Sequence, residues 1–234
     1  MYTICFDMPE RPHVDQVYSR LRWLIIEGRY PPGTRLIEER LASDLGVSRT
    51  PVRQALARVA AEGLVRIFPN RGAVVRRFTT ADLLEIYDLR ALLEGHAAYL
   101  AASRIAPEQL TILKDAADAL EQSLTQTFDS HTEEVRFLVE QNAIFHDTVL
   151  FAAGNERLTS IVHTVVDIPL QFRSFYWYTP EERQISNFFH RAILKALQQG
   201  DGERARAMMR EHIYHGRDVL LQHFNDDQMT DIEQ

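Results

Sequence analysis

The stretch Gly46–Leu64, with the sequence GVSRTPVRQALARVAAEGL, carries the strongest structural signal in the chain. Apolar residues recur in it every three or four positions, which is the spacing of one face of an α-helix. These residues are Val52, Ala55, Leu56 and Val59. Pro51 is compatible with a helix that begins near Ser48, because the first turn needs no backbone donor there. We therefore predict a helix from about Ser48 to Glu62.

A shorter helix is predicted just before this one, over Glu38–Leu45. Its apolar positions are Leu41, Ala42 and Leu45, and Gly46 is a C-terminal stop signal. Further upstream, apolar residues at helical spacing predict a first helix over 13–28. Two helices joined by a short glycine-containing turn form a helix-turn-helix, whose second helix enters the major groove. Double-stranded operator DNA is therefore the expected partner.

The polar face of the predicted Ser48–Glu62 helix suits contact with DNA. Arginine can donate two hydrogen bonds to guanine, glutamine can bond adenine, and threonine can reach a phosphate or a thymine methyl. Residues of these types lie in the first two turns, the end expected in the groove. The candidate DNA contacts are Arg49, Thr50, Arg53 and Gln54.

A β-hairpin is predicted after this helix. Leu64–Phe68 is rich in large apolar residues, 73–77 contains β-branched residues, and the sequence PNRG between them is typical of a turn. In a winged helix-turn-helix such a hairpin is the wing. Arg71 and Gly72 at its tip are then expected beside the minor groove or the DNA backbone.

Charge divides the chain into two parts. The 234 residues have a net charge of −7, which by itself argues against a nucleic-acid partner. Residues 11–77, however, hold 13 arginines and six acidic residues, a net charge of +7, whereas 78–234 have −12. Chance clustering of solvated charges is the alternative. We expect a tail at 1–10, a DNA-binding domain at 11–77, a second domain at 78–225 and a tail at 226–234.

Composition excludes other classes of protein. A single cysteine, Cys5, cannot form an intrachain disulfide or a cysteine-based zinc cluster, which favours a reducing compartment. No apolar run reaches the roughly 18 residues of a membrane span, and the N-terminus lacks the pattern of a signal peptide. The expected location is the cytoplasm, with no membrane partner.

Helical patterns run through the acidic part of the chain, separated by turn signals such as Pro107, Pro180 and Gly200. We expect the helices at about 80–103, 107–127, 131–153, 156–176, 180–199 and 201–224, with Thr80 and Asp201 as N-caps. These patterns predict an all-α bundle of about six helices that is able to enclose a pocket.

Three histidines in the predicted bundle are candidates for a metal site. His146, His190 and His212 lie on three different helices and are flanked by apolar residues, so they are expected to point inward. Neutral imidazole is a good ligand for a divalent transition metal. Asn142 lies one turn before His146 on the same helix face. An inward-facing histidine is more often an ordinary core residue, and this is the alternative that the pattern alone favours.

Residues 24–75 resemble the DNA-binding domain of the GntR family of bacterial transcription regulators. The PPG turn, the LGVSRTPVR helix start, the AEGL helix end and the RGA wing follow in the family's order and spacing. The DNA contacts that the resemblance implies are Arg49, Thr50, Arg53, Arg71 and Gly72. Arg40 is a weaker candidate, because some branches read DNA with an arginine one position earlier, where this chain has Glu39.

The acidic part resembles the FCD-type ligand-binding domain of the FadR branch of this family, in the arrangement NAIFH…FFHRAILKALQQGD…MREHI. In that domain an Asp and three His bind zinc, nickel or a similar ion beneath the carboxylate of an effector. The resemblance implies His146, His190 and His212 as ligands. Asn142 stands where the family has Asp, so it is a weak ligand or none. A metal-free pocket, in which the histidines bond the effector directly, is the alternative.

Arg90 occupies a position where members of the family commonly have an arginine facing the effector cavity. A guanidinium there would bind a small carboxylate through two hydrogen bonds. An ion pair with Glu94, four residues later on the same helix, is the alternative explanation and is compatible with that role.

These predictions together describe a mainly α fold, with an N-terminal winged helix-turn-helix, a small β-hairpin wing and a C-terminal all-α bundle. The expected function is that of a non-enzymatic regulator that binds a pseudo-palindromic operator as a homodimer and responds to a small organic acid. A regulator that senses the metal ion itself is the alternative. A metal-dependent hydrolase is a weaker rival, because no catalytic base is evident.

Overall fold

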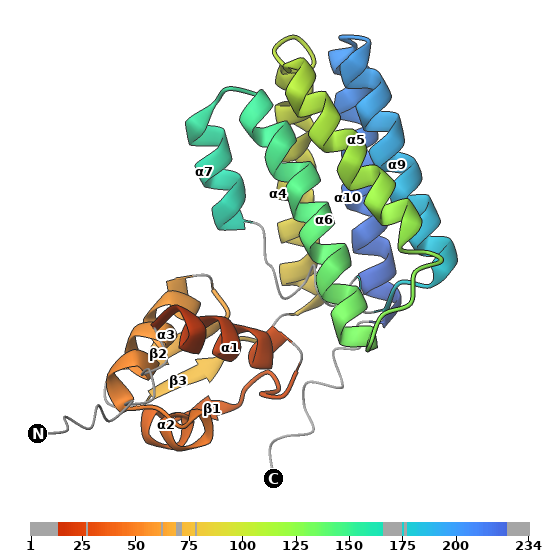
Figure 1. Cartoon of the computed structure of the whole chain (residues 1–234). Helices are drawn as coiled ribbons and strands as arrows, with labels where there is room; N and C mark the ends of the chain where they lie inside the picture. Colours follow the sequence, from red (N-terminus) through yellow and green to blue (C-terminus); the bar gives the residue numbers. More distant parts are fainter. Residues whose placement is uncertain are drawn as a thin grey trace, which may run out of the picture. The chain divides into compact units, whose positions relative to one another are not determined.

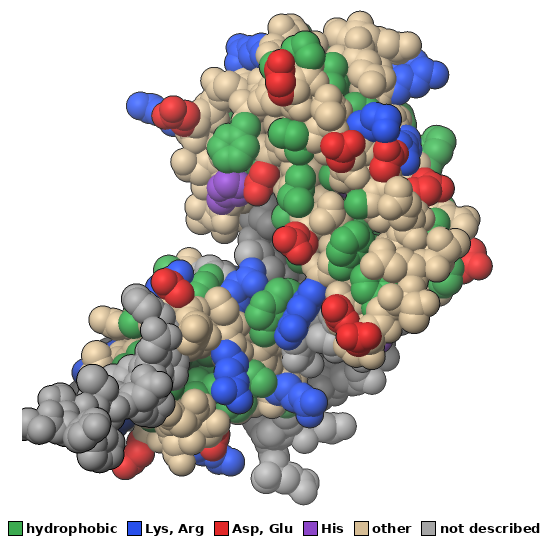
Figure 2. Space-filling view, viewed as in Figure 1, with side chains coloured by type: hydrophobic (Ala, Val, Ile, Leu, Met, Phe, Trp, Pro, Cys, Tyr) green, Lys and Arg blue, Asp and Glu red, His purple; other side chains and the backbone are tan. Residues whose placement is uncertain are grey.

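The computed structural model describes residues 14–26, 28–61, 63–68, 72–77, 79–165, 175 and 177–223. The chain divides after Arg77 into two compact units, which we call the N-terminal unit and the helical unit (Figure 1). The division coincides with the change from net positive to net negative charge. On the face seen in Figure 2, Lys and Arg side chains gather over the N-terminal unit, whereas Asp and Glu side chains are spread over the helical unit.

Helices α1 (Val14–Ile26), α2 (Glu38–Leu45) and α3 (Arg49–Ala61) belong to the N-terminal unit. The turn between α2 and α3 contains Gly46, whose φ of 67° is the left-handed conformation that commonly ends a helix. Its backbone N–H donates to the carbonyl of Ser43 over 3.2 Å. The predicted helix-turn-helix is confirmed.

The helix faces predicted to be apolar are the faces that are buried. In α3 the buried residues are Val52, Ala55, Leu56 and Val59. In α2 they are Leu41, Ala42 and Leu45. α3 packs on α1, where Leu21 is completely buried. Burial of these apolar side chains leaves the polar face of α3 open to solvent.

A small antiparallel sheet completes the N-terminal unit. β2 (Val65–Phe68) pairs with β3 (Gly72–Val75), which is the predicted hairpin. β1 (Arg35–Leu36), which the sequence pattern did not predict, pairs with the other side of β3, so the strand order is β1-β3-β2. A strand of two residues is too short for an alternating pattern to be recognised. The N-terminal unit is a winged helix-turn-helix.

Gly72 has a structural reason to be glycine. Its φ of 81° lies in the left-handed region, and a Cβ at this position would come within 2.6 Å of the Leu36 carbonyl oxygen in β1. Any other residue would strain the backbone and push β1 away from β3. The glycine of the RGA sequence therefore permits the close pairing of these two strands.

The helical unit contains α4 (Thr80–Ala101), α5 (Pro107–Gln122), α6 (His131–Ala152), α7 (Glu156–Val165), α9 (Pro180–Gln198) and α10 (Gly202–His223). Each begins within one residue of its predicted start, and Figure 1 shows the long helices packed side by side as a bundle. Most of the predicted helix beyond Val165 lies outside the described residues. No helix in the described part of the chain is long and apolar enough to cross a membrane.

Two details of the predicted helix ends need correction. The N-cap of α4 is Thr79, not Thr80, and its hydroxyl accepts from the N–H of Asp82 while the Asp82 carboxylate accepts from the Thr79 N–H. α5 ends at Gln122 rather than near 127, because the Ser123 hydroxyl donates to a carbonyl of the last turn and closes it. The prediction of Asp201 as the N-cap of α10 is confirmed by its bond from the Arg204 N–H.

α4 lies at the centre of the bundle and packs against α10, α6 and α7. Its buried face contributes Tyr87 to a core shared with Phe145 of α6 and Ile193 of α9. The same face carries two charged residues, Arg90 and Glu94, which are only 4% and 2% exposed. Buried charges are stable in a protein core only when partners surround them. This part of α4 is therefore where a polar site is built into the helical unit.

Candidate DNA-binding surface and buried histidine site

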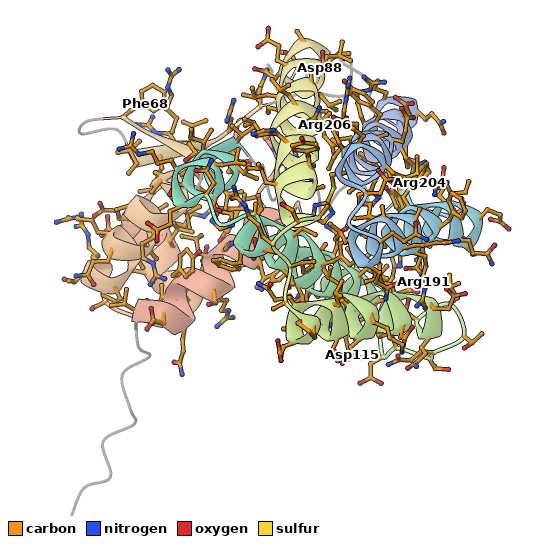
Figure 3. The ribbon with its side chains drawn as sticks, turned by 90° about the horizontal axis from the view of Figure 1, so that it is seen from above. Phe68, Asp88, Asp115, Arg191, Arg204 and Arg206 are labelled. Carbon is orange, nitrogen blue, oxygen red and sulfur yellow. The ribbon has the colours of Figure 1, made fainter. Side chains whose placement is uncertain are left out.

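A groove of about 670 Å³ opens between the polar face of α3, the start of α2 and the sheet of the N-terminal unit. It brings together the predicted DNA contacts Arg49, Arg53 and Gly72. The groove is also lined by exposed apolar side chains, Ile67 of β2 among them. Phe68, at the end of β2, lines it too and projects outward in Figure 3. The groove thus joins cationic and apolar groups on one open surface.

Glu38, the first residue of α2, pairs with the two arginines of this groove. Its carboxylate accepts two hydrogen bonds from Arg53, one from Nε over 3.0 Å and one from Nη2 over 2.8 Å. It also lies 3.5 Å from Nη2 of Arg49. The hydrogen bonds from Arg53 are the main reason why the pKa of Glu38 lies below its ordinary value. The carboxylate therefore stays ionised beside both arginines.

The remaining predicted DNA contacts differ in their surroundings. Thr50 and Gln54 are exposed on α3. Arg40 is exposed on α2 but lines a separate hollow of about 240 Å³ together with Arg29 and Arg35. Arg71 lies outside the described residues. The structure thus gathers Arg49, Arg53 and Gly72 in one groove and places Arg40 apart from them.

The three predicted histidines meet in the helical unit. His146 of α6, His190 of α9 and His212 of α10 are all buried, and each offers a ring nitrogen within 4.8 Å of those of the others. Nε2 of His146 lies 3.0 Å from Nε2 of His212. The ring centres of His190 and His212 are 4.3 Å apart. Three helices distant in sequence therefore contribute to one cluster, and the prediction that these histidines point inward is confirmed.

Glu94 connects this cluster to Arg90. One carboxylate oxygen accepts from Nε of Arg90 over 2.9 Å, and the other lies 2.5 Å from Nδ1 of His146. Burial alone would raise the pKa of Glu94, but Arg90 and His146 together hold it at about 2. An ionised Glu94 accepts the Nδ1 proton of His146 and thereby fixes the orientation of that ring.

Several buried polar atoms of the cluster have no hydrogen-bond partner. Among the described residues six buried side-chain nitrogen or oxygen atoms are unpaired, and four of them belong to this cluster. They are Asn142 Oδ1, both ring nitrogens of His190, and Nδ1 of His212. Buried polar atoms are nearly always paired in folded proteins. The cluster therefore offers several buried polar atoms to which a ligand can bond.

A divalent transition metal fits these residues. The pKa values of His190 and His212 lie well below the ordinary value, mainly because both rings are buried. Both rings are therefore neutral at neutral pH. Neutral imidazole is the form that binds a metal. Asn142 Oδ1 adds an uncharged oxygen donor.

Arg90 faces a small cavity beside the histidines. The cavity, of about 20 Å³, is lined by Arg90, Asn142 and His212, and by the rings of Tyr87 and Tyr178. Its volume is sufficient for one water molecule. Arg90 also forms the ion pair with Glu94 that was the alternative explanation for its position. The same residue therefore forms the ion pair and lines the cavity.

Two functional candidates were not identified in the sequence as members of these sites. The sequence pattern indicates Glu94 only as an ion-pair partner of Arg90, although Glu94 also bonds His146, 52 residues away. Glu38 bonds Arg53 across 15 residues. Neither contact follows from helical spacing, because each joins two different helices. An acidic residue on a predicted buried helix face is the signal that could have indicated Glu94.

A winged helix-turn-helix with an arginine-lined groove, followed by a helical unit, defines a class of two-domain transcription regulators. Residues 13–75 match the family model described as bacterial regulatory proteins, gntR family, and residues 85–215 match the model of the FCD domain. The chain therefore belongs to the GntR family of bacterial transcription regulators and carries an FCD domain.

Individual relatives agree with this assignment. The transcriptional repressor RspR of Escherichia coli is 30% identical over 209 residues, which cover 88% of this chain and 87% of RspR. The gluconate operon transcriptional repressor of Bacillus subtilis is 27% identical over 218 residues, covering 90% and 84%. The solved structure of E. coli McbR/YncC has a TM-score of 0.73 and 25% identity, covering 91% and 98%.

Substitution of Glu94 tests the buried ion pair. Glu94→Gln should lower the free energy of unfolding of the helical unit by about 3–5 kcal/mol at pH 7, because Arg90 is left buried without its counter-charge. Since the pKa of Glu94 is lowered from 4.5 to about 2, its stabilising effect is complete above pH 4.5 and is lost as the pH falls toward 2. Urea unfolding at several pH values should show this loss in the unsubstituted protein and less of it in the variant.

Glu85→Gln is the matched control, because Glu85 is exposed on the same helix. It should change the free energy of unfolding by no more than about 0.5 kcal/mol. Equal stability of the two variants would show that Glu94 is not a structural partner of Arg90.

Proposed function

We propose that this GntR-family regulator binds a pseudo-palindromic DNA operator as a homodimer, and that a small carboxylate in the helical unit changes its affinity for DNA. The observation that carries the proposal is that the chain has both an arginine-lined groove on α3 and a buried site that contains Arg90 and three histidines. The proposed place of action is the cytoplasm, where the DNA partner is found. The relatives named above are regulators of transcription, which fits a non-enzymatic role.

The proposed DNA contacts are made from the groove of the N-terminal unit. The first two turns of α3 would enter the major groove, with Arg49 and Arg53 donating to guanine or phosphate and with Thr50 and Gln54 beside them. Gly72 would bring the wing close to the DNA backbone. The positive charge of residues 11–77 would attract the duplex.

Homodimer formation is proposed to use the outer face of α4. This helix carries apolar side chains on both faces, and its outer stripe of Leu89, Leu92 and Tyr99 is 43%, 64% and 38% exposed. A helix with two apolar faces needs a partner for the second one. Arg206 of α10, labelled in Figure 3, would border the interface. Its guanidinium lies 4.2 Å from the centre of the Tyr99 ring.

The proposed effector is a small organic acid at Arg90. A guanidinium beside neutral histidines suits a carboxylate, because it supplies charge and paired donors. The cavity of about 20 Å³ would have to widen by movement of its aromatic lining, Tyr87, Phe175 and Tyr178. The name of one relative refers to a gluconate operon, and gluconate is such an acid. Binding can change DNA affinity only if the acid favours one arrangement of the dimer.

A divalent transition metal, zinc or nickel, is the proposed cofactor of this site. His146, His190 and His212 would hold it, with Asn142 as a weak ligand or none. A bound dication would supply positive charge for the carboxylate of the effector. The protein residues contribute the orientation: Glu94 fixes the tautomer of His146, and burial keeps His190 and His212 neutral.

A regulator that senses the metal ion itself is the second candidate function. The size of the cavity favours it, because about 20 Å³ holds a single water molecule but no organic acid without rearrangement. In that case, binding of the ion to the three histidines would itself change the arrangement of the helices.

Substitution of Arg53 tests the recognition helix. Duplexes bound by the unsubstituted protein are first selected from a random-sequence library. Arg53→Ala should bind the selected duplex about 10- to 100-fold more weakly, because a bidentate donor is removed from the groove. Fluorescence anisotropy measures the affinity, and circular dichroism checks the fold.

Arg58→Ala is the matched control for charge. Arg58 is also on α3, but it pairs with Asp15 and lies over the ring of Tyr18 on α1. Its loss removes the same charge outside the groove and should weaken binding much less. Equal losses in the two variants would contradict the assignment of the groove.

Metal and carboxylate titrations separate the two candidate functions. Zinc or nickel is added to metal-stripped protein bound to the selected duplex, with and without gluconate and a panel of other small carboxylic acids. We expect a change in DNA affinity that requires both the metal and an acid. Release of DNA by the metal alone would favour the metal sensor, and no response to either would contradict both.

Variants locate the metal in the same experiment. His190→Ala should abolish binding of one metal ion per chain, whereas His215→Ala should not, because Nε2 of His215 is bonded to the Glu182 carbonyl. Asn142→Asp should tighten metal binding by about tenfold, because it adds a charged ligand. Unchanged affinity in Asn142→Asp would show that this side chain does not face the metal.

Substitution of Leu92 tests the proposed dimer face. Leu92→Glu places a charge in the centre of the outer stripe of α4 and should convert the dimer to a monomer in sedimentation velocity. Phe188→Glu is the control, since Phe188 of α9 is equally exposed at 63%. A monomer produced by Phe188→Glu instead would place the interface on α9.

A further inference from the structure

We infer that Glu38 is a positioning residue for DNA recognition, which fixes Arg53 by one edge of its guanidinium so that the other edge is presented to DNA. The inference rests on the proposed function, since it assigns a role within the DNA-binding groove. It concerns a residue that carries the charge opposite to that expected of a DNA contact. Its basis is the geometry of the Glu38–Arg53 pair and its place in the groove.

The pairing uses a particular edge of the guanidinium. Nε of Arg53 bonds one oxygen of Glu38 over 3.0 Å, and Nη2 bonds the other oxygen over 2.8 Å. A guanidinium is planar and has five N–H groups in fixed directions. Two of them are therefore used by Glu38. Of the other three, one on Nη1 and one on Nη2 form a second edge that does not face the carboxylate. This second edge is the fork that matches guanine or phosphate oxygens.

The two side chains of the pair differ in exposure, as a positioning role for Glu38 requires. The side chain of Glu38 is 24% exposed, whereas that of Arg53 is 68% exposed. The Glu38 carboxylate is thus the less exposed partner, and Arg53 is the more exposed one. A free arginine side chain samples many rotamers, and the entropy lost when DNA orders it weakens binding. Because Glu38 already orders the Arg53 side chain in the free protein, less side-chain entropy is lost when DNA binds.

Arg49, at the start of α3, lies near the same carboxylate as Arg53. Its Nη2 lies 3.5 Å from the same Glu38 oxygen that Arg53 Nη2 contacts. Two arginines four residues apart on one helix repel each other. A carboxylate placed between them offsets that repulsion and allows both to point into one groove. Glu38 therefore acts on the pair of arginines rather than on one.

This arrangement favours specific over non-specific binding. Attraction to DNA of any sequence depends on the number of cationic groups near the phosphates. Glu38 neutralises part of the charge of the groove and so weakens that attraction, while it orients the donors that read base edges. Removal of its charge should therefore raise affinity for random DNA and lower affinity for the operator. A residue with a purely electrostatic effect would move both affinities in the same direction.

Glu39 provides the matched control. It is the next residue on α2, lines the same groove and lies in the same first turn. Carboxylates in the first turn of a helix interact favourably with its N-terminal end, and this effect applies to both residues. Glu39→Gln thus reproduces the change of charge and of helix stability. The loss of the Arg53 pairing is specific to Glu38→Gln.

The test compares the two variants on two duplexes. One duplex is selected from a random library by the unsubstituted full-length protein, and the other is an unselected duplex of equal length. Glu38→Gln should bind the selected duplex about tenfold more weakly and the unselected duplex severalfold more tightly. Glu39→Gln should tighten binding to both. Anisotropy at several salt concentrations gives the affinities, and thermal unfolding shows that both variants are folded.

A second comparison tests whether Glu38 acts through Arg53. In an Arg53→Ala background, Glu38→Gln should weaken binding of the selected duplex much less than tenfold, because only the longer contact with Arg49 remains to be lost. A full tenfold effect in that background would overturn the inference. Equal behaviour of Glu38→Gln and Glu39→Gln in the otherwise unsubstituted protein would overturn it as well. Failure of the unsubstituted protein to select any duplex would instead overturn the proposed function.

Discussion

A single buried carboxylate organises the helical unit. Glu94 is 2% exposed in the centre of α4, where an ionised group is unstable unless its surroundings compensate for the lost water. Arg90 compensates its charge, and His146 occupies its second oxygen. Because one carboxylate has both partners, the guanidinium that faces the cavity and the imidazole of the histidine cluster are fixed relative to each other. A ligand that moves either group acts on the same helix.

The N-terminal unit uses the same chemistry at its surface. Glu38 also pairs with arginine through two hydrogen bonds, but the arginine remains 68% exposed. In water such a pair contributes little to stability, so its main effect is on the direction in which the arginine points. In the helical unit the corresponding pair is enclosed and supports the fold. One pair thus organises a binding surface, and the other organises a buried site.

The sequence predicted the features that depend on local periodicity. The buried faces of α2 and α3 follow from apolar spacing, and the starts of the bundle helices follow from turn signals. Apolar neighbours also predicted that His146, His190 and His212 point inward, whereas their meeting in one cluster was implied by the family resemblance. The sequence did not predict β1, whose two residues carry no pattern, or the partners of Glu38 and Glu94, which lie on other helices. Such contacts depend on how helices pack, and a local pattern contains no information about that.

The sequence pattern of the DNA selected by the unsubstituted protein tests the central claim most directly. Two recognition helices in a symmetric dimer contact half-sites about one helical turn apart, so their spacing reports both DNA reading and dimer formation. Sequencing of duplexes enriched from a random library should reveal two inverted half-sites with centres about 10 base pairs apart. Enrichment of a single unpaired site, or no enrichment, would contradict the account.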